Sequence, residues 1–149
     1  MIEYSVSTEL RIDWSDLDAL GHVNHLAIMR YIQTARVLYF ELLGMSSRVK
    51  GLHVGPIMAS VGAQFKKQIL YPGNVRVLST IHELKTTSLH MKHYVIDDED
   101  EIAAEGHDVI VMFDFKSNCK HGITDDLRGK IEAIEGNKKV FNKNAEKLI

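Results

Sequence analysis

The feature that most constrains the fold is a single long segment of helical periodicity, residues 25–43, which lies between segments that alternate like β-strands. Within it, apolar residues recur three or four positions apart, at Ile28, Ile32, Ala35, Tyr39 and Leu42. This is the spacing of one helix face, and other apolar residues widen the stripe almost all round. We therefore expect a helix that is buried on most sides, capped at its start by Asn24 and ended by Gly44.

The segments around this helix have the pattern of extended strands. Residues 4–14 approximate an alternating strand before the helix. After it, alternation and β-branched residues predict four long strands, over residues 57–69, 75–84, 89–96 and 102–115. A short helix is expected over residues 125–134, and the Lys- and Asn-rich tail, residues 136–149, is expected to be loosely ordered.

The order of these elements predicts an α+β fold. Its simplest form is a five-stranded, mostly antiparallel sheet wrapped around one long central helix. The chain has 149 residues, of which 45% are hydrophobic and 26% charged, so it has the size and balance of a single domain, residues 1–149. A single sheet leaves one helix face and at least one strand edge uncovered. We therefore expect a homo-oligomer, either a dimer or a tetramer built from two dimers.

Composition narrows the possible partners and the compartment. With 18 basic and 20 acidic residues the formal net charge is -2, which gives no basic field for a nucleic acid or an anionic membrane. No segment approaches the roughly 20 apolar residues of a membrane span, and the start has no signal-peptide pattern. The single cysteine, Cys119, excludes an intramolecular disulfide and fits a reducing compartment. These features predict a cytoplasmic protein in which Cys119 is structural.

Residues 16–25 concentrate the chemistry, because they place two carboxylates and two imidazoles in the turn before the helix. These side chains belong to Asp16, Asp18, His22 and His25. The free N–H groups of a helix start carry about half a positive charge, which suits them to polarise a carbonyl or stabilise an oxyanion. A nearby carboxylate can then attack that carbonyl or activate water. Gly21 suits a point where the backbone turns sharply or approaches a ligand closely.

A set of motifs extends from this segment along the chain. They are Asp16-x-Asp18-x-x-Gly21-His22-Val23-Asn24, Arg30-Tyr31, the turn Tyr71-Pro72-Gly73-Asn74 and the helix start Asp125-Asp126-Leu127. Together with the strand order they resemble the hot-dog-fold thioesterases of the 4-hydroxybenzoyl-CoA thioesterase type, over residues 4–135. In that family the second Asp of the Asp-x-Asp-x-x-Gly motif is the catalytic carboxylate, and Asp18 matches it.

The resemblance is divided between two branches of that family. His25 matches the histidine of a bacterial acyl-CoA thioesterase branch with a Val-Tyr-His sequence, while residues 21–24 look like a branch that carries Gly-His-Val-Asn-Asn. The chain has Ile28 where a Tyr is usual and Gln33 where a Glu is common. The acyl group of the substrate therefore cannot be carried over from either branch.

The resemblance implies hydrolysis of an acyl-CoA or acyl-carrier-protein thioester without a cofactor. Asp18 would act as nucleophile or general base, His25 and His22 would complete the catalytic set, and the His25 N–H is the best backbone donor for the carbonyl. The residues expected to contact substrate are Gly21, Asn24 and Tyr31. The CoA phosphates have five candidate partners, none of which is assigned: Lys66, Lys67, Arg76, Lys85 and Lys92.

Each of these residues also has a structural interpretation. Asp16 is more typical of a turn cap, and Asn24 of a helix cap. His22 either bonds a loop carbonyl or contacts substrate. Asp18, His22 and His25 have the chemical types of a zinc site, but their spacing matches no metal motif, so no metal site is expected.

The other histidines do not suggest a metal site either. His90 and His93 are three apart on a predicted strand and face opposite sides, so they do not form a chelating pair. The histidines at positions 53, 82, 107 and 121 are scattered and are interpreted as solvated or hydrogen-bonded.

Two other functions are alternatives to thioester hydrolysis, and the sequence argues against both. A hot-dog acyl-CoA hydratase would carry Asp and His with four residues between them and an Asn-Pro, whereas Asp18 and His22 have three between them and no Asn-Pro. A non-catalytic acyl-CoA sensor would usually add a DNA-binding segment, for which the few residues before the first strand leave no room. The presence of Asp18 also favours catalysis.

Overall fold

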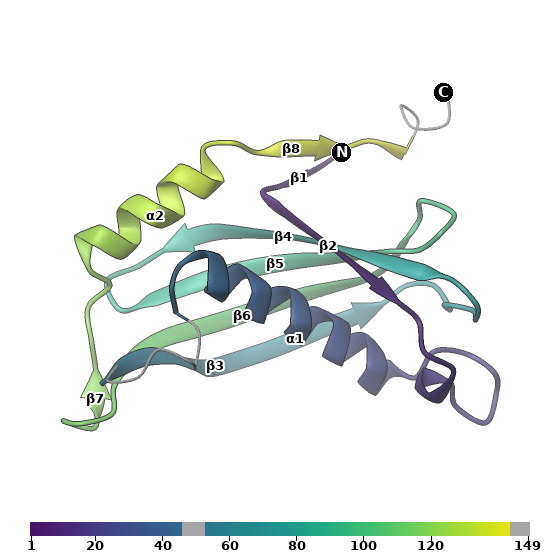
Figure 1. The fold of residues 1–149 in the computed structure, drawn as a ribbon, viewed down its shortest axis with the longest axis horizontal. Coiled ribbons are helices and arrows are strands. Elements are labelled where there is room, and N and C mark those ends of the chain that lie inside the picture. The colour runs from purple at the N-terminus through teal and green to yellow at the C-terminus, as the bar shows by residue number, and fades with distance from the viewer. Residues whose placement is uncertain (46–52, 144–149) are drawn as a thin grey trace.

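A computed structural model, described for residues 1–45 and 53–143, has one long helix lying against one face of a curved antiparallel sheet (Figure 1). The sheet has six strands, in the order β2-β4-β5-β6-β3, with the short β7 paired to β6. Their bounds are β2 (Val6–Arg11), β3 (Val54–Phe65), β4 (Asn74–Leu84), β5 (Ser88–Ile96), β6 (Ile102–Asp114) and β7 (Cys119–Lys120). The predicted α+β hot-dog architecture is confirmed, but the sheet has a sixth, two-residue strand, β7, where five strands were predicted.

The long helix, α1 (His25–Leu42), begins where the sequence predicts and ends one residue earlier than predicted. The Asn24 side chain accepts a hydrogen bond from the Leu26 N–H at 2.9 Å, which satisfies one of the free donors of the first turn. Beyond the last turn, Gly44 has a φ of 73°, a conformation that favours glycine.

α1 packs closely on the centre of the sheet because β6 carries a glycine beneath it. A Cβ atom at Gly106 would lie only 2.8 Å from Cδ1 of Ile32, so a larger residue would require the Ile32 side chain to shift. Ile32 and Ala35 are fully buried at this contact. Two hydrophobic clusters lie between helix and sheet, one around Ile32 and one around Tyr39.

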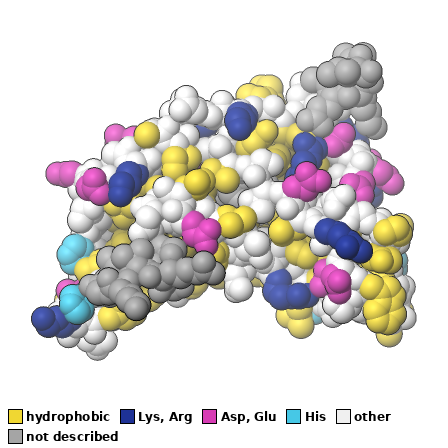
Figure 2. All heavy atoms as spheres, in the orientation of Figure 1, with side chains coloured by type: hydrophobic (Ala, Val, Ile, Leu, Met, Phe, Trp, Pro, Cys, Tyr) yellow, Lys and Arg dark blue, Asp and Glu magenta, His cyan; other side chains and the backbone are white. Residues whose placement is uncertain are grey.

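The prediction that α1 is buried on most sides is wrong for the single chain. The sheet covers one side only, and four apolar side chains remain exposed on the helix, Leu26, Val37, Leu38 and Leu42. Figure 2 shows hydrophobic side chains interspersed with charged ones on the face that carries α1. The sheet curves around the helix without enclosing it, so this stripe is available to cover by another surface.

The first strand and the last described strand pair with each other beside the main sheet (Figure 1). β1 (Ile2–Tyr4) pairs with β8 (Lys139–Phe141), whereas the sequence predicts one strand over residues 4–14 and a loosely ordered tail from residue 136. Residues 139–141 form a strand instead, and Phe141 is buried in a small cluster with Leu78 and Ile96. Residues 144–149 lie outside the described residues.

The second helix, α2 (Asp125–Glu135), is capped by Thr124 and is held against β4 by its last residue. The Glu135 carboxylate accepts hydrogen bonds from the Tyr39 hydroxyl at 2.5 Å, from Thr80 Oγ1 at 2.7 Å and from the Ile81 N–H at 2.7 Å. Glu135 therefore links α2 to both α1 and the sheet. Neither α1 nor α2 is long and apolar enough to cross a membrane.

A buried polar network joins α1 to three strands in the middle of the core. Arg36 donates from Nε to Oδ2 of Asp108 at 2.8 Å and from Nη2 to Oδ1 at 3.1 Å. His93 Nε2 lies 2.6 Å from Oδ2 of Asp108, and its Nδ1 lies 2.8 Å from the Ser79 hydroxyl. Burial raises the pKa of Asp108, but the hydrogen bonds from His93 and Arg36 outweigh burial and hold that pKa below its ordinary value.

Candidate active site

The loop between β2 and α1 is held in place by Asp16, the last residue of the short helix η1 (Trp14–Asp16). Its buried carboxylate accepts hydrogen bonds from the Tyr31 hydroxyl at 2.6 Å, from Arg30 Nη2 at 2.8 Å and from the Asp13 N–H at 3.0 Å. Burial raises the pKa of Asp16, but these three donors lower it overall. Asp16 thus ties the loop to α1, in agreement with its interpretation as a turn cap.

Tyr31 lies beneath this loop. Burial and the bond to Asp16 raise the pKa of its hydroxyl, so Tyr31 remains a donor at neutral pH. Its only polar side-chain atom is therefore already engaged with Asp16. The expected contact of Tyr31 with substrate would be made through its ring.

Asp18 lies exposed at the tip of the loop. Its Oδ1 accepts from the Leu20 N–H at 2.9 Å and from the His22 N–H at 3.3 Å, while its own N–H donates to the His22 carbonyl at 2.9 Å. Gly21 makes this tight turn possible with a φ of 81°. Within residues 1–45 and 53–143, Oδ2 of Asp18 accepts no hydrogen bond, so one oxygen holds the turn and the other is open.

A cavity of about 240 Å³ opens between this loop and the chain that leaves β3. It is lined by His22, Val23, His25, Ile28 and residues 65–69. The His25 ring stands edge-on to Phe65, with the ring centroids 6.1 Å apart. The Val23 N–H donates to the Ile69 carbonyl at 2.9 Å, which fixes the two walls together.

The start of α1 offers one free donor beside this cavity. The Leu26 N–H is taken by the Asn24 side chain, and the Ala27 and Ile28 N–H groups donate to the Asn24 carbonyl. No acceptor among the described residues takes the His25 N–H. Since the helix dipole adds partial positive charge at this end, a carbonyl oxygen or oxyanion placed here would be stabilised.

The structure brings only some of the predicted site residues together. His22 and His25 line the cavity, whereas Asp18 does not line it and is linked to it by the hydrogen bond that its Oδ1 accepts from the His22 N–H. Gly21, Asn24 and Tyr31 do not line the cavity but shape the loop and the helix start. The opposite wall, residues 65–69, includes Lys66 and Lys67, which the sequence analysis considers only as unassigned partners of the CoA phosphates. The rest of this wall is absent from the sequence-based set, because it lies about forty residues further along the chain and carries no motif.

The profile of the thioesterase-like superfamily matches residues 12–136, a span that includes the loop, the cavity and both helices. The chain belongs to the thioesterase-like superfamily. It is accordingly a thioester hydrolase with the hot-dog fold. No curated protein sequence matches it significantly.

Solved structures agree with this thioesterase assignment. A thioesterase from Thermus thermophilus, in complex with coenzyme A and Zn, is 28% identical, with a TM-score of 0.77 over 90% of this chain and 97% of that one. The PA2801 protein of Pseudomonas aeruginosa is 28% identical, with a TM-score of 0.78 over 86% of this chain and 98% of that one. A DHNA-CoA thioesterase from Staphylococcus aureus, 18% identical, shares the fold with a TM-score of 0.77 over 100% and 97%.

Most cations considered for the CoA phosphates already have acidic partners in this thioesterase. Lys66 pairs with Glu105 at 3.1 Å, Arg76 with Asp100 at 2.6 Å and Lys85 with Glu83 at 3.7 Å. Lys67 contacts Asp97 at 2.7 Å and Glu99 at 3.0 Å, and its hydrogen bonds to these two carboxylates raise its pKa. Lys92 has no ion-pair partner in the part of the chain that the structure describes. Phosphates would have to displace surface pairs, which are individually weak.

Proposed function

We propose that this chain hydrolyses acyl-CoA thioesters in the cavity at the start of α1. The observation that carries the proposal is the free His25 N–H, which lies at a cavity beside the loop that holds Asp18. A thioester oxygen bound there would gain a hydrogen bond that strengthens as negative charge develops on it. The Thermus relative, solved with coenzyme A, supports CoA as the thiol part of the substrate.

The proposed reaction uses Asp18 on the side of the carbonyl carbon opposite to the His25 N–H. In one route the Asp18 carboxylate attacks the carbon, the C–S bond breaks, the thiolate takes a proton, and water hydrolyses the resulting anhydride. In the other route Asp18 takes a proton from water, which attacks directly. Both routes give the free acid and the thiol. Both use Oδ2 of Asp18, because Oδ1 accepts the hydrogen bonds of the turn.

A single-turnover reaction in oxygen-18 water identifies the nucleophilic route when the label appears on Asp18. Attack by Asp18, followed by addition of water to the Asp18 side of the anhydride, leaves the first acid molecule unlabelled and places the label on the Asp18 carboxylate. A general-base route labels the acid at once and never labels Asp18. Mass spectrometry of the acid and of the peptide that contains Asp18 reads both outcomes.

The function itself is tested by a hydrolysis screen with aromatic, short and long acyl-CoAs and with acyl-carrier proteins, read as free thiol. We expect at least one acyl-CoA to be turned over, and a chelator to leave the rate unchanged, because Asp18 supplies the chemistry. If only carrier-protein thioesters are hydrolysed, the thiol part of the substrate is the carrier protein and not CoA. If acyl-CoA binds without turnover, the chain is an acyl-CoA sensor.

We further propose that the chain acts as a homodimer, alone or as half of a tetramer. β3 is an edge strand with Met58, Val61 and Phe65 exposed, and its end forms one wall of the cavity. A second copy paired along β3 would cover this edge and border the active site.

Light scattering tests the assembly. We expect a mass of at least twice 16.9 kDa at micromolar concentration. A Val61→Asp variant, with a charge on the β3 edge, should shift the protein toward monomer, while Ser7→Asp on the opposite edge strand should not. A wild-type mass of one chain would contradict the proposal.

A further inference from the structure

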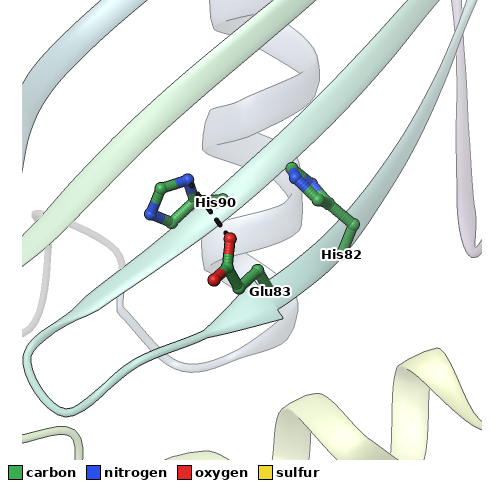
Figure 3. A group of neighbouring side chains, drawn as sticks. All are labelled: His82, Glu83 and His90. Carbon is green, nitrogen blue, oxygen red and sulfur yellow. Dashed lines mark ion pairs between the residues drawn. The ribbon is translucent and has the colours of Figure 1, made fainter.

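Three potential metal ligands lie close together where β4 ends and β5 begins, on the side of the sheet away from α1. They are His82 and Glu83 on β4 and His90 on β5, and one ligand atom from each lies within 4.8 Å of the others. Figure 3 shows the three side chains on one side of the two strands, with α1 passing behind. His90 Nδ1 and Glu83 Oε2 are 3.9 Å apart, and the rings of His82 and His90 have centroids 6.0 Å apart.

A β-bulge explains why two neighbouring residues share a face. Ile81 pairs with Met91 and Glu83 with His90, so His82 is an extra residue without a partner in the register. In a regular strand His82 and Glu83 would point to opposite faces. The bulge turns both outward while Ile81 remains in the core. Simple alternation along β4 therefore conceals this cluster.

The cluster is chemically ready to bind a cation. His82 is exposed and His90 is half-buried, so a metal ion can reach an imidazole nitrogen on each of them. Glu83 adds the negative charge. Its competing partner, Lys85, is 3.7 Å away in a surface pair that a divalent cation would displace readily.

We propose that His82, Glu83 and His90 form a binding site for one divalent transition-metal ion of the Zn²⁺ type. Two imidazoles and one carboxylate are the ligands that Zn²⁺ accepts, whereas Mg²⁺ and Ca²⁺ prefer all-oxygen sites. Tetrahedral Zn²⁺ requires ligand atoms about 3.3 Å apart, so the side chains must close in slightly. The Glu83 side chain is 48% exposed and free to rotate, and a fourth position stays open to water.

This metal site is separate from the thioester site. The turn between β4 and β5 lies toward the C-terminal end of α1, whereas the cavity lies at its N-terminal end (Figure 1). A metal ion there would tie the bulged part of β4 to β5, which makes it a stabilising site. The inference is thus independent of the proposed function, and activity is not its readout.

The experiment is calorimetric titration of ZnCl₂ into tag-free protein that has been dialysed against chelator. We expect one Zn²⁺ per chain, a melting temperature that rises with Zn²⁺ as mass action requires, and no binding of Mg²⁺. His82→Gln, Glu83→Gln and His90→Gln should each weaken binding at least about 100-fold, since even residues that only support metal ligands contribute 10–100-fold. His121→Gln, an imidazole that contacts the Gly122 carbonyl elsewhere, is the matched control and should leave affinity unchanged.

These side chains border solvent, so the variants should melt like the wild type without metal, which a parallel melt checks. Absence of Zn²⁺ binding in the wild type would overturn the proposal. So would a His82→Gln variant that binds Zn²⁺ as tightly as the wild type, because the ion would then occupy another set of ligands.

Discussion

The loop before α1 and the buried polar network around Asp108 contain carboxylates and imidazoles in opposite environments. In the core, Ser79, His93 and Asp108 carry the residue types of a hydrolytic triad, yet each is at most 1% exposed. Every charged group among them is bonded, with Arg36 balancing Asp108. In the loop, Asp18 is exposed and has an oxygen without a hydrogen bond from the described residues, while its other oxygen accepts from the N–H of His22, which lines the cavity together with His25.

Exposure to solvent and unused hydrogen-bonding capacity, more than residue type, therefore distinguish a reactive group from a structural one. A substrate cannot reach the Asp108 network, and all its bonding capacity serves to join α1 to β4, β5 and β6. Asp18 keeps half of its carboxylate unused. The two carboxylates should therefore fail in different ways when they are altered: one in stability, the other in chemistry.

The largest expected effect is on stability, from Asp108→Asn. Loss of the negative charge leaves Arg36 buried without compensation, and breaking a buried pair in this way costs about 3–5 kcal/mol. Denaturant unfolding should report that loss. Asp126→Asn is the control, because Asp126 is exposed and pairs with Lys130 only at the surface, which should contribute less than about 1 kcal/mol. Equal stability of the two variants would contradict a structural role for the network.

The stability of the folded protein at acid pH also depends on Asp108. The folded-state pKa of Asp108 lies below its ordinary value of 3.8, so the folded protein favours the ionised form. The resulting stability is present above about pH 4 and is lost as the pH falls through the folded pKa. Stability measured by denaturant from pH 5 downward should thus fall more steeply in the wild type than in Asp108→Asn. Parallel curves would mean that Asp108 does not contribute to the acid sensitivity.

A smaller effect, on the rate of hydrolysis, is expected from His25→Ala at the start of α1. Its backbone N–H survives the truncation, so the rate should fall less than about tenfold, well short of the loss expected on removing a general base. His22→Ala serves as the internal comparison on the same cavity, with kcat and KM measured for both variants. A His25→Ala loss as large as that of Asp18→Asn would assign catalysis to the imidazole itself.

Much of the fold was accessible from the sequence because it rests on local periodicity and caps. The long helix, its Asn24 cap and the four long strands follow from such patterns, and they are confirmed, although the strand predicted over residues 57–69 is Val54–Phe65. The exposed apolar face of α1 and the pairing of β8 were not, because they depend on how far the sheet curves and on where Phe141 finds a pocket.

The site was predicted in part for the same reason. His22 and His25 lie in the local turn and were identified, whereas the wall at residues 65–69 comes from a distant strand end. The cluster at His82 was missed because a bulge breaks the alternation that the prediction relied on. Arg36, within an otherwise apolar helix stripe, was the one signal of a buried ionic partner, and its partner Asp108 is 72 residues away.

The central claim is that Asp18 performs the chemistry, and single-turnover hydrolysis by Asp18→Asn beside thermal melting tests it most directly. Asn keeps the size and the acceptor for the turn but removes the anion. We expect the rate on the best acyl-CoA to fall by about a hundred-fold or more, while substrate binding survives and stability changes by no more than about 1 kcal/mol. A folded Asp18→Asn variant with near wild-type single-turnover rates would remove Asp18 from the mechanism.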